Sequence, residues 1–412
     1  MMTNKSDLLP YGACSTVVHE LTLPASLNFR ECTQIDHQPF PQPNGKDTVG
    51  SGDADSTVDF AIANGLHLMW YEALSNPERN ALRASVADRI RSRALADVHH
   101  NLLLAVRLGE LVSAFRGAGI AFVSYKGPVL AQQLYGSLAL RPYSDLDLMV
   151  RKGDLETIDS LMKEMGFAEV YLEKAIDGPH LHHRQYFRES ERLMVEIHWA
   201  PAQTYWPIQM DMVAAIAKAE TVMVAGQPTP SFRADDLLLI LSLHAAKHYW
   251  RRLIWVEDIK RLVESRSDWD WPAVAEKARE AGCWRILLVN LALARDLAGL
   301  QLPDFWDREL RSETAAELIR RTIVHSVSNG GIDALDSRER NRLYFQMRER
   351  FHDRLPYFFF HLKTPNPQDR RVPPLPERYH FLYYLIRPFR LLARLILHPA
   401  KTYKLIGSLL TR

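Results

Sequence analysis

The sequence predicts an α/β (α+β) fold, in which a small mixed sheet is followed by a larger helical region. Three observations support this prediction. Two short apolar runs, 119–125 and 193–199, have the length and composition of buried strands. A third strand-like run, 144–150, carries two acidic residues two positions apart. From Arg233 onward, apolar residues recur at mostly helical spacing.

Changes in composition divide the chain into five parts. Residues 1–60 mix Pro, Gly, Ser, Asp and Thr without periodicity, so we expect a disordered or loosely attached segment. The sheet and its leading helices are expected over 61–230, followed by a helical domain over 231–330. An irregular Pro-rich connector is expected over 331–377, and a basic amphipathic tail over 378–412.

Bulk properties limit the class of protein. The 412 residues are 47% hydrophobic and 24% charged, as in ordinary globular proteins, and a net charge of +2 gives no argument for nucleic-acid binding. Cys14, Cys32 and Cys283 are widely spaced, so neither a disulfide framework nor a zinc cluster is expected. The N-terminus lacks the basic and then apolar pattern of a secretory signal, so the expected location is cytoplasmic.

The strand-like run at 144–150 holds the most informative pair of residues. Side chains alternate along a strand, so Asp145 and Asp147 point one way while Leu146 and Leu148 point into a core. Two like charges on one face repel each other, and a divalent cation such as Mg²⁺ offsets this by binding carboxylates together with substrate phosphates. The alternative is a pair of solvated acids on an exposed strand face.

A glycine turn precedes these acids. The apolar run ending at Tyr125 leads directly into Lys126, Gly127 and Pro128, and a helical segment follows that stops at Gly136. Glycine allows close approach of a ligand to the backbone, and proline suits the first turn of a helix. Free backbone N–H groups at such a turn can bind an anion, and Lys126 would lie beside it.

A third acid comes from the strand-like run at 193–199. Its alternation places Glu196 and His198 on one face, with Val195, Ile197 and Trp199 on the other. His198 could contact a substrate, orient Glu196, or be a structural histidine. Further along, a stripe of residues at spacings of three and four is predicted to share one helical face. It consists of His244, His248, Arg251, Trp255 and Asp258. The stripe could line a nucleotide cleft, where Trp255 or a histidine stacks on a base, or form part of a core.

These motifs together resemble a family of bacterial nucleotidyltransferases whose members are often left uncharacterised. This family belongs to the superfamily that includes DNA polymerase beta. The resemblance covers about 80–264 and rests on the following residues: Lys126-Gly127, Leu134-Tyr135, Arg141, Ser144-Asp145-Leu146-Asp147-Leu148 and Glu196-Ile197-His198-Trp199. Two features depart from the superfamily pattern. Lys-Gly replaces the commoner Gly-Ser, and the third acid is Glu196 where Asp is more usual.

The resemblance implies a polymerase-beta-like core and transfer of a nucleotidyl group from a nucleoside triphosphate such as ATP to an acceptor hydroxyl. Asp145, Asp147 and Glu196 would be catalytic ligands of Mg²⁺ or Mn²⁺, with Glu196 a candidate general base. The nucleotide would contact Lys126, Gly127, Arg141, Ser144, His198, His244, His248 and Trp255. Arg141 could instead brace the loop before the acids, and Ser144 could make a local turn hydrogen bond.

The acceptor stays open between a protein, a small molecule and an RNA. Two other functions also stay open: a glycosyltransferase with an Asp-x-Asp metal site, and a non-catalytic nucleotide-binding regulator on the same fold. The tail over 378–412 carries seven Arg and Lys residues and no acid, which is typical of a segment that contacts an anionic membrane surface, an RNA or a partner. It could equally fold back on the body with its arginines in water.

Overall fold

The computed structural model describes residues 53–74, 82–170, 181–328, 335, 337–365 and 374–397. Its main sheet consists of β1 (Phe122–Ser124), β2 (Leu146–Val150), β3 (Ala168–Glu169), β4 (His183–Arg188) and β5 (Leu193–His198). The spatial order is β1-β2-β5-β4-β3. Strands β2 and β5 run parallel, and the other neighbouring pairs run antiparallel. The predicted small mixed sheet is therefore confirmed.

Alternation along β2 sends its side chains into two different cores. Leu146, Leu148 and Val150 pack with α5 (Ala84–Gly117) and α7 (Leu155–Glu164) on one face of the sheet. On the other face, Met149 belongs to the core of the helical domain. Asp147 shares this second face, so the acidic residue points between the sheet and the helical domain.

Further elements surround the sheet. In chain order they are α2 (Asp53–Ala63), α3 (His67–Ala73), α6 (Gly127–Tyr135), η1 (Lys152–Asp154), η3 (Glu189–Glu191), α8 (Met212–Ala217), β6 (Glu220–Val224) and β7 (Gln227–Ser231). Strands β6 and β7 form an antiparallel hairpin whose ends contact α6 and β1. The expected loose segment 1–60 lies mainly outside the described residues, and its last eight residues belong to α2.

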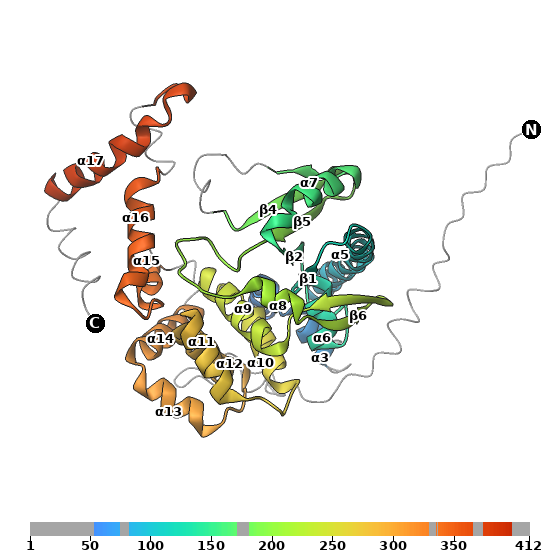
Figure 1. Cartoon of the computed structure of the whole chain (residues 1–412). Coiled ribbons are helices and arrows are strands. Elements are labelled where there is room, and N and C mark those ends of the chain that lie inside the picture. The colour runs from blue at the N-terminus through green and yellow to red at the C-terminus, as the bar shows by residue number, and fades with distance from the viewer. Residues whose placement is uncertain are drawn as a thin grey trace, which may run out of the picture.

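The helical domain begins at α9 (Ala234–Lys247). Its other helices are α10 (Ile254–Glu264), α11 (Trp271–Ala281), α12 (Trp284–Ala298), α13 (Asp304–Ser312) and α14 (Thr314–Ser328). In Figure 1 these helices, in yellow and orange, gather on the opposite side of the molecule from α7 and β4. Helix α12 is buried along nearly its whole length and forms the centre of this domain.

One expectation about the helical domain was wrong. The stripe from His244 to Asp258 does not lie on a single helix, because α9 ends at Lys247 and α10 begins only at Ile254. Between them, Tyr249 and Trp250 adopt positive φ angles of 55° and 52°, which stop the helix. The side chain of Trp250 is buried and donates to Asn290 Oδ1 at 2.9 Å, which stabilises this turn.

The region expected as an irregular connector is also different. It contains α15 (Ser337–Gln346), η5 (Phe351–Arg354) and α16 (Leu355–Lys363), and is followed by η7 (Glu377–Tyr379) and α17 (Leu382–Leu397). The prolines at 365–376 misled the prediction because they mark only the link between α16 and α17. Both of these helices, in red in Figure 1, extend away from the helical domain. No helix among the described residues is long and apolar enough to cross a membrane.

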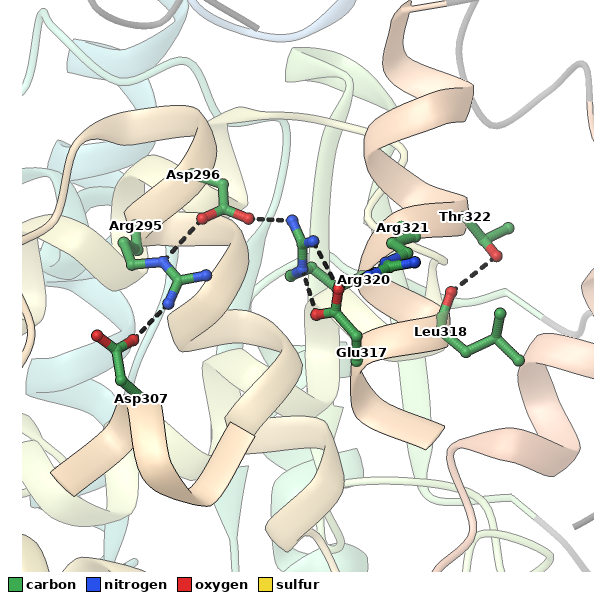
Figure 2. Close-up of polar contacts among 8 residues, drawn as sticks. All are labelled: Arg295, Asp296, Asp307, Glu317, Leu318, Arg320, Arg321 and Thr322. Atoms are coloured by element: carbon green, nitrogen blue, oxygen red, sulfur yellow. Dashed lines mark hydrogen bonds and ion pairs between the residues drawn. The ribbon is translucent and has the colours of Figure 1, made fainter. Parts of the chain in front are cut away.

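Charged side chains link α12, α13 and α14 at the surface (Figure 2). Arg295 contacts Asp296 and Asp307, and Arg320 contacts both Asp296 and Glu317. Arg320 also donates two hydrogen bonds to Glu317, at 2.7 and 2.8 Å. Hydrogen bonds from Arg320 lower the pKa of Glu317 to about 2.

Replacing Glu317 with Gln is expected to lower the free energy of unfolding at pH 7 by about 0.5–1 kcal/mol, the scale of a well-aligned surface ion pair. The pKa of Glu317 is depressed from 4.5, so its contribution is present above pH 4.5 and is lost as the pH falls toward 2. Urea denaturation at pH 7 and at pH 3 measures this. A difference between the two proteins that grows at low pH would contradict the assignment.

Candidate active site

The acidic residues come together because their strands are neighbours. In the parallel pairing of β2 and β5, Asp147 lies opposite Glu196 in register, and Met149 lies opposite His198. Residues opposite each other in adjacent strands point to the same face. Val195 and Ile197 alternate to the other face and are fully buried in its core. The predicted orientation of Glu196 and His198 is therefore what the structure shows.

Asp147 is the centre of the cluster and is only 2% exposed. Its Oδ1 lies 2.7 Å from Lys126 Nζ and 3.0 Å from His198 Nε2. His198 Nε2 also lies 3.2 Å from Glu196 Oε2, and Gln185 donates to Glu196 Oε1 at 2.7 Å. One ligand atom each from Asp147, Glu196 and His198 lies within 4.8 Å of the others, which is close enough for one metal ion.

Electrostatics differ among the three acids. Burial raises the pKa of Asp145 to about 7, and the negative charge of Asp147 adds to this. Burial also opposes ionisation of Asp147, but Lys126 and His198 hold its pKa well below the usual range. The pKa of Glu196 is lowered to about 2, because its hydrogen bond with His198 outweighs the opposing effect of burial. Asp147 and Glu196 are thus ionised at neutral pH, while Asp145 holds its proton to a higher pH than either of them.

This difference predicts how metal binding depends on pH. A carboxylate must be deprotonated to bind a metal ion, and the pKa of Asp145 is about 7. We therefore expect the affinity of the nucleotide-free protein for Mn²⁺ to rise as the pH increases from 6 to 8. Isothermal titration with Mn²⁺ at several pH values measures this. In an Asp145→Asn variant the affinity for Mn²⁺ should increase less over this pH range. If it increased as much as in the unmodified protein, a group other than Asp145 would control the pH dependence.

The residues present fit a divalent ion. Carboxylate oxygens are the usual ligands of Mg²⁺ and Mn²⁺, while the imidazole of His198 is a ligand that suits transition metals better. A second group of candidate ligands, His182, His183 and His198, shares one member with the first. Burial lowers the pKa of His183 to about 4, so its ring is uncharged at neutral pH, the form in which imidazole binds metals.

The predicted glycine turn lies beside the acids. Gly127 has a φ of +56°, and a Cβ placed there would lie 3.1 Å from the backbone oxygen of Asp145. Only glycine meets both conditions without strain. Pro128 follows in the first turn of α6, and Gly136, in a left-handed conformation, ends the helix. The N-terminus of α6 and the ammonium group of Lys126 therefore flank the carboxylates.

Arg141 lies in a different environment from the one a phosphate clamp needs. Its guanidinium donates two hydrogen bonds of 2.8 Å to the carboxylate of Asp258, and Tyr135 donates a third at 2.7 Å. Burial opposes the charge of Arg141, but Asp258 raises its pKa above the usual value. The pair joins the loop before β2 to α10, which supports the bracing role. Ser144 is exposed at the end of this loop.

The predicted histidine and tryptophan stripe still gathers, although it comes from two helices and a turn. The ring of His244 lies 4.8 Å from that of His248 and 4.9 Å from that of Trp255, centroid to centroid. Burial holds the pKa of His244 well below its usual value and lowers that of His248 to about 4. Both rings are therefore neutral at pH 7.

Sequence reasoning missed four residues beside the acids. His182 and His183 lie at the start of β4, where His183 pairs with His198 in register and its ring stacks on that of His198 at 5.0 Å. Gln185 pairs with Glu196 on the same strands. Lys247 Nζ lies 3.1 Å from His182 Nε2. The adjacent histidines at 182 and 183 were the available signal, but only the strand pairing shows that His183 lies opposite His198.

The chain belongs to the family described as "Uncharacterised nucleotidyltransferase", whose model matches residues 50–299. This match confirms the resemblance to nucleotidyltransferases and covers the whole acidic cluster. No curated protein matches the chain.

Two solved structures are similar to parts of it. One is an antigenic nucleotidyltransferase-like protein from Paracoccidioides brasiliensis, with 16% identity, a TM-score of 0.29, and coverage of 43% of this chain and 88% of that one. The other is the antibiotic-resistance factor ANT(2'')-Ia, with 11% identity, a TM-score of 0.28, and coverage of 54% and 98%. Both superpositions are partial, so the family assignment rests on the match over 50–299.

Proposed function

We propose that this nucleotidyltransferase is metal-dependent and transfers a nucleoside monophosphate from a nucleoside triphosphate to an acceptor hydroxyl, releasing pyrophosphate. The observation that carries the proposal is the register of β2 and β5, which sets Asp147 opposite Glu196. Asp145 lies close enough for its charge to couple with both. Three carboxylates in this arrangement suit a pair of divalent ions.

Each residue has a role in the proposal. Asp145, Asp147 and Glu196 would hold Mg²⁺ or Mn²⁺, which when bound activates the attacking oxygen and neutralises charge on the phosphates. Glu196, oriented by Gln185 and His198, would accept the proton of the acceptor hydroxyl.

The triphosphate would lie at the N-terminus of α6. Backbone N–H groups at Gly127 would bind its oxygens, and the ammonium group of Lys126 would balance its charge. Since Lys126 already contacts Asp147, one cation would serve both the acidic cluster and the phosphates.

Labelled ATP, GTP, CTP and UTP test the proposal. Each is incubated with the purified protein, Mg²⁺ or Mn²⁺ and a cell extract, and the label is traced to protein, RNA or small-molecule fractions. We expect α-phosphate label, and no γ-phosphate label, to appear in one of these fractions. Transfer of γ-phosphate label would indicate a kinase instead.

The two other functions have separate tests. Membership of a nucleotidyltransferase family argues against a glycosyltransferase. Isothermal titration tests this: binding of a UDP-sugar, without binding of any nucleoside triphosphate, would favour the glycosyltransferase. A non-catalytic regulator would bind nucleotides without transferring label. The presence of all three acids argues against it, because a protein that only binds nucleotide has no need of them.

The proposed membrane contact has support at the C-terminal end. Exposed apolar side chains concentrate on η5, α16, α17 and the turn before α17, and they include Phe351, Phe358, Phe359, Phe381, Leu385 and Phe389. Residues 378–412 carry only positive charges. Apolar side chains beside basic ones fit an anionic lipid surface. Arg387 is buried, and α17 packs against α16. The residues at 398–412 lie outside the described part of the chain.

Liposome flotation tests this contact. We expect the protein to float with vesicles containing phosphatidylserine and to float less with neutral vesicles. A Phe389→Asp variant should lose flotation, because that ring is 73% exposed on the proposed surface. Leu95→Asp, at a site 65% exposed on α5, is the control. Equal flotation of all three proteins would remove the membrane proposal.

A further inference from the structure

A cavity of about 230 Å³ lies between the segment after β5, the end of α9 and the C-terminal helices. Six of its nine lining side chains are Tyr, Trp or Phe. Two of the rings, Tyr344 and Tyr357, stack on each other with centroids 3.5 Å apart. Two others, Tyr205 and Phe360, face each other at 4.4 Å. Walls of this kind suit a planar aromatic ring.

The cavity also presents an unused hydrogen-bond acceptor. Gln203 lines it, and its Oε1 is buried with no hydrogen-bond partner in the described part of the chain. A buried acceptor without a donor is costly, so a bound molecule that supplies an N–H group would relieve this cost. Each of the four nucleobases carries such a donor on its edge. An amide side chain is a common reader of that edge.

Lys247 connects the cavity to the acids. It lines the cavity, and its Nζ lies 3.1 Å from His182 Nε2, whose ring is 5.7 Å from that of His198. Lys126, which contacts Asp147, lies close enough to Lys247 for their charges to repel each other. A chain of phosphates between them would relieve their repulsion.

We propose that this cavity holds the base of the nucleoside triphosphate, that Gln203 reads the edge of the base, and that the phosphates pass Lys247 toward Asp147 and Glu196. The inference rests on the proposed function and assigns a base-binding site to it. Tyr344, Tyr357 and Phe360 lie beyond residues 50–299, so the C-terminal helices would complete a site begun within the family match.

A buried cation lies behind the aromatic wall. The guanidinium of Arg348 lies 3.7 Å from the ring centroid of Trp206 and 4.3 Å from that of Tyr344. It is 1% exposed, and its three nitrogens have no hydrogen-bond partner among the described residues. Asp353 favours this charge from nearby, so Arg348 belongs to the support of the aromatic wall.

Nucleotide binding without an acceptor tests the proposal. Dissociation constants for ATP, GTP, CTP and UTP with Mg²⁺ are measured by isothermal titration, and inorganic tripolyphosphate serves as the probe without a base. Phe360→Ala is expected to weaken the best-bound triphosphate about tenfold, the usual effect of losing one stacking ring, and to leave tripolyphosphate unchanged. Gln203→Ala should weaken the same nucleotide by a similar factor.

Leu355→Ala is the matched control, because Leu355 is an exposed apolar residue on the same helix as Phe360 and does not line the cavity. Thermal unfolding of each variant shows whether the fold is retained. The proposal is overturned if both cavity variants bind all four triphosphates as the unmodified protein does, which would be the result if the cavity held an aromatic acceptor. It is also overturned if tripolyphosphate binding falls equally.

Failure of the proposed function gives a different result. Base-dependent loss of binding in the variants, together with no transfer of label in any extract, would support the base site while removing nucleotidyl transfer. Transfer of label, together with unchanged nucleotide binding in both variants, would support nucleotidyl transfer while removing the base site. The two ideas are therefore separable in one set of proteins.

Discussion

An Asp147→Asn variant is expected to lose nucleotidyl transfer, with kcat about 10³-fold lower, the scale of removing one charged group that stabilises a transition state. Asn keeps the shape of the side chain but removes the charge that metal binding needs. It also leaves Lys126 and His198 facing a neutral oxygen in place of the carboxylate that they contact at 2.7 and 3.0 Å. Transfer of α-phosphate label from the preferred triphosphate measures the effect.

Asp88→Asn is the control for this variant, because Asp88 lies on α5 with its side chain 71% exposed. The control should transfer label at the unmodified rate. Titration with Mn²⁺ should show weaker binding to the Asp147 variant alone. If that variant kept full activity, Asp147 would not be a metal ligand, and the assignment of all three acids would have to be abandoned.

The second large effect concerns stability. Replacing Asp258 with Ala is expected to lower the free energy of unfolding by about 3–5 kcal/mol, the cost of removing one partner of a buried ion pair. Arg141 is 5% exposed and would keep its charge without the two hydrogen bonds that Asp258 accepts. The hydroxyl of Tyr135 would lose its acceptor as well. Urea denaturation at pH 7 measures the loss.

Asp268→Ala provides the comparison, since the side chain of Asp268 is 69% exposed and pairs only with Arg266 in the described region. Its effect should be far smaller than that of Asp258→Ala, because water screens an exposed ion pair. If the two variants unfolded at the same urea concentration, the Arg141–Asp258 pair would not hold the two domains together in the way the geometry indicates.

The sequence predicted the acidic cluster well, for a physical reason. Strand alternation is strictly local, so the face shared by Asp145 and Asp147, and that shared by Glu196 and His198, can be read from spacing alone. What spacing cannot show is that β2 and β5 are parallel neighbours, which sets Asp147 opposite Glu196. Resemblance to a family supplied that step, and the family match over 50–299 agrees with it.

Other parts of the site could not be predicted because they depend on tertiary packing. His183 and Gln185 face the acids only through the pairing of β4 with β5. The expected single stripe failed because backbone conformation at Tyr249 and Trp250 ends α9, and no local pattern announced those positive φ angles. The cavity could not be predicted from the sequence either, because its lining residues Tyr205 and Phe360 lie far apart in the chain and meet only in the folded protein.

The ion pair between Arg141 and Asp258 has a consequence for how the protein could be divided. It fastens the loop before β2 to α10, so the carboxylates of the sheet and Lys247 of α9 form one continuous unit. Fragments 82–231 and 234–365, made as separate polypeptides, would each expose one half of this pair and a broad apolar face. Neither fragment is therefore expected to fold as an independent module.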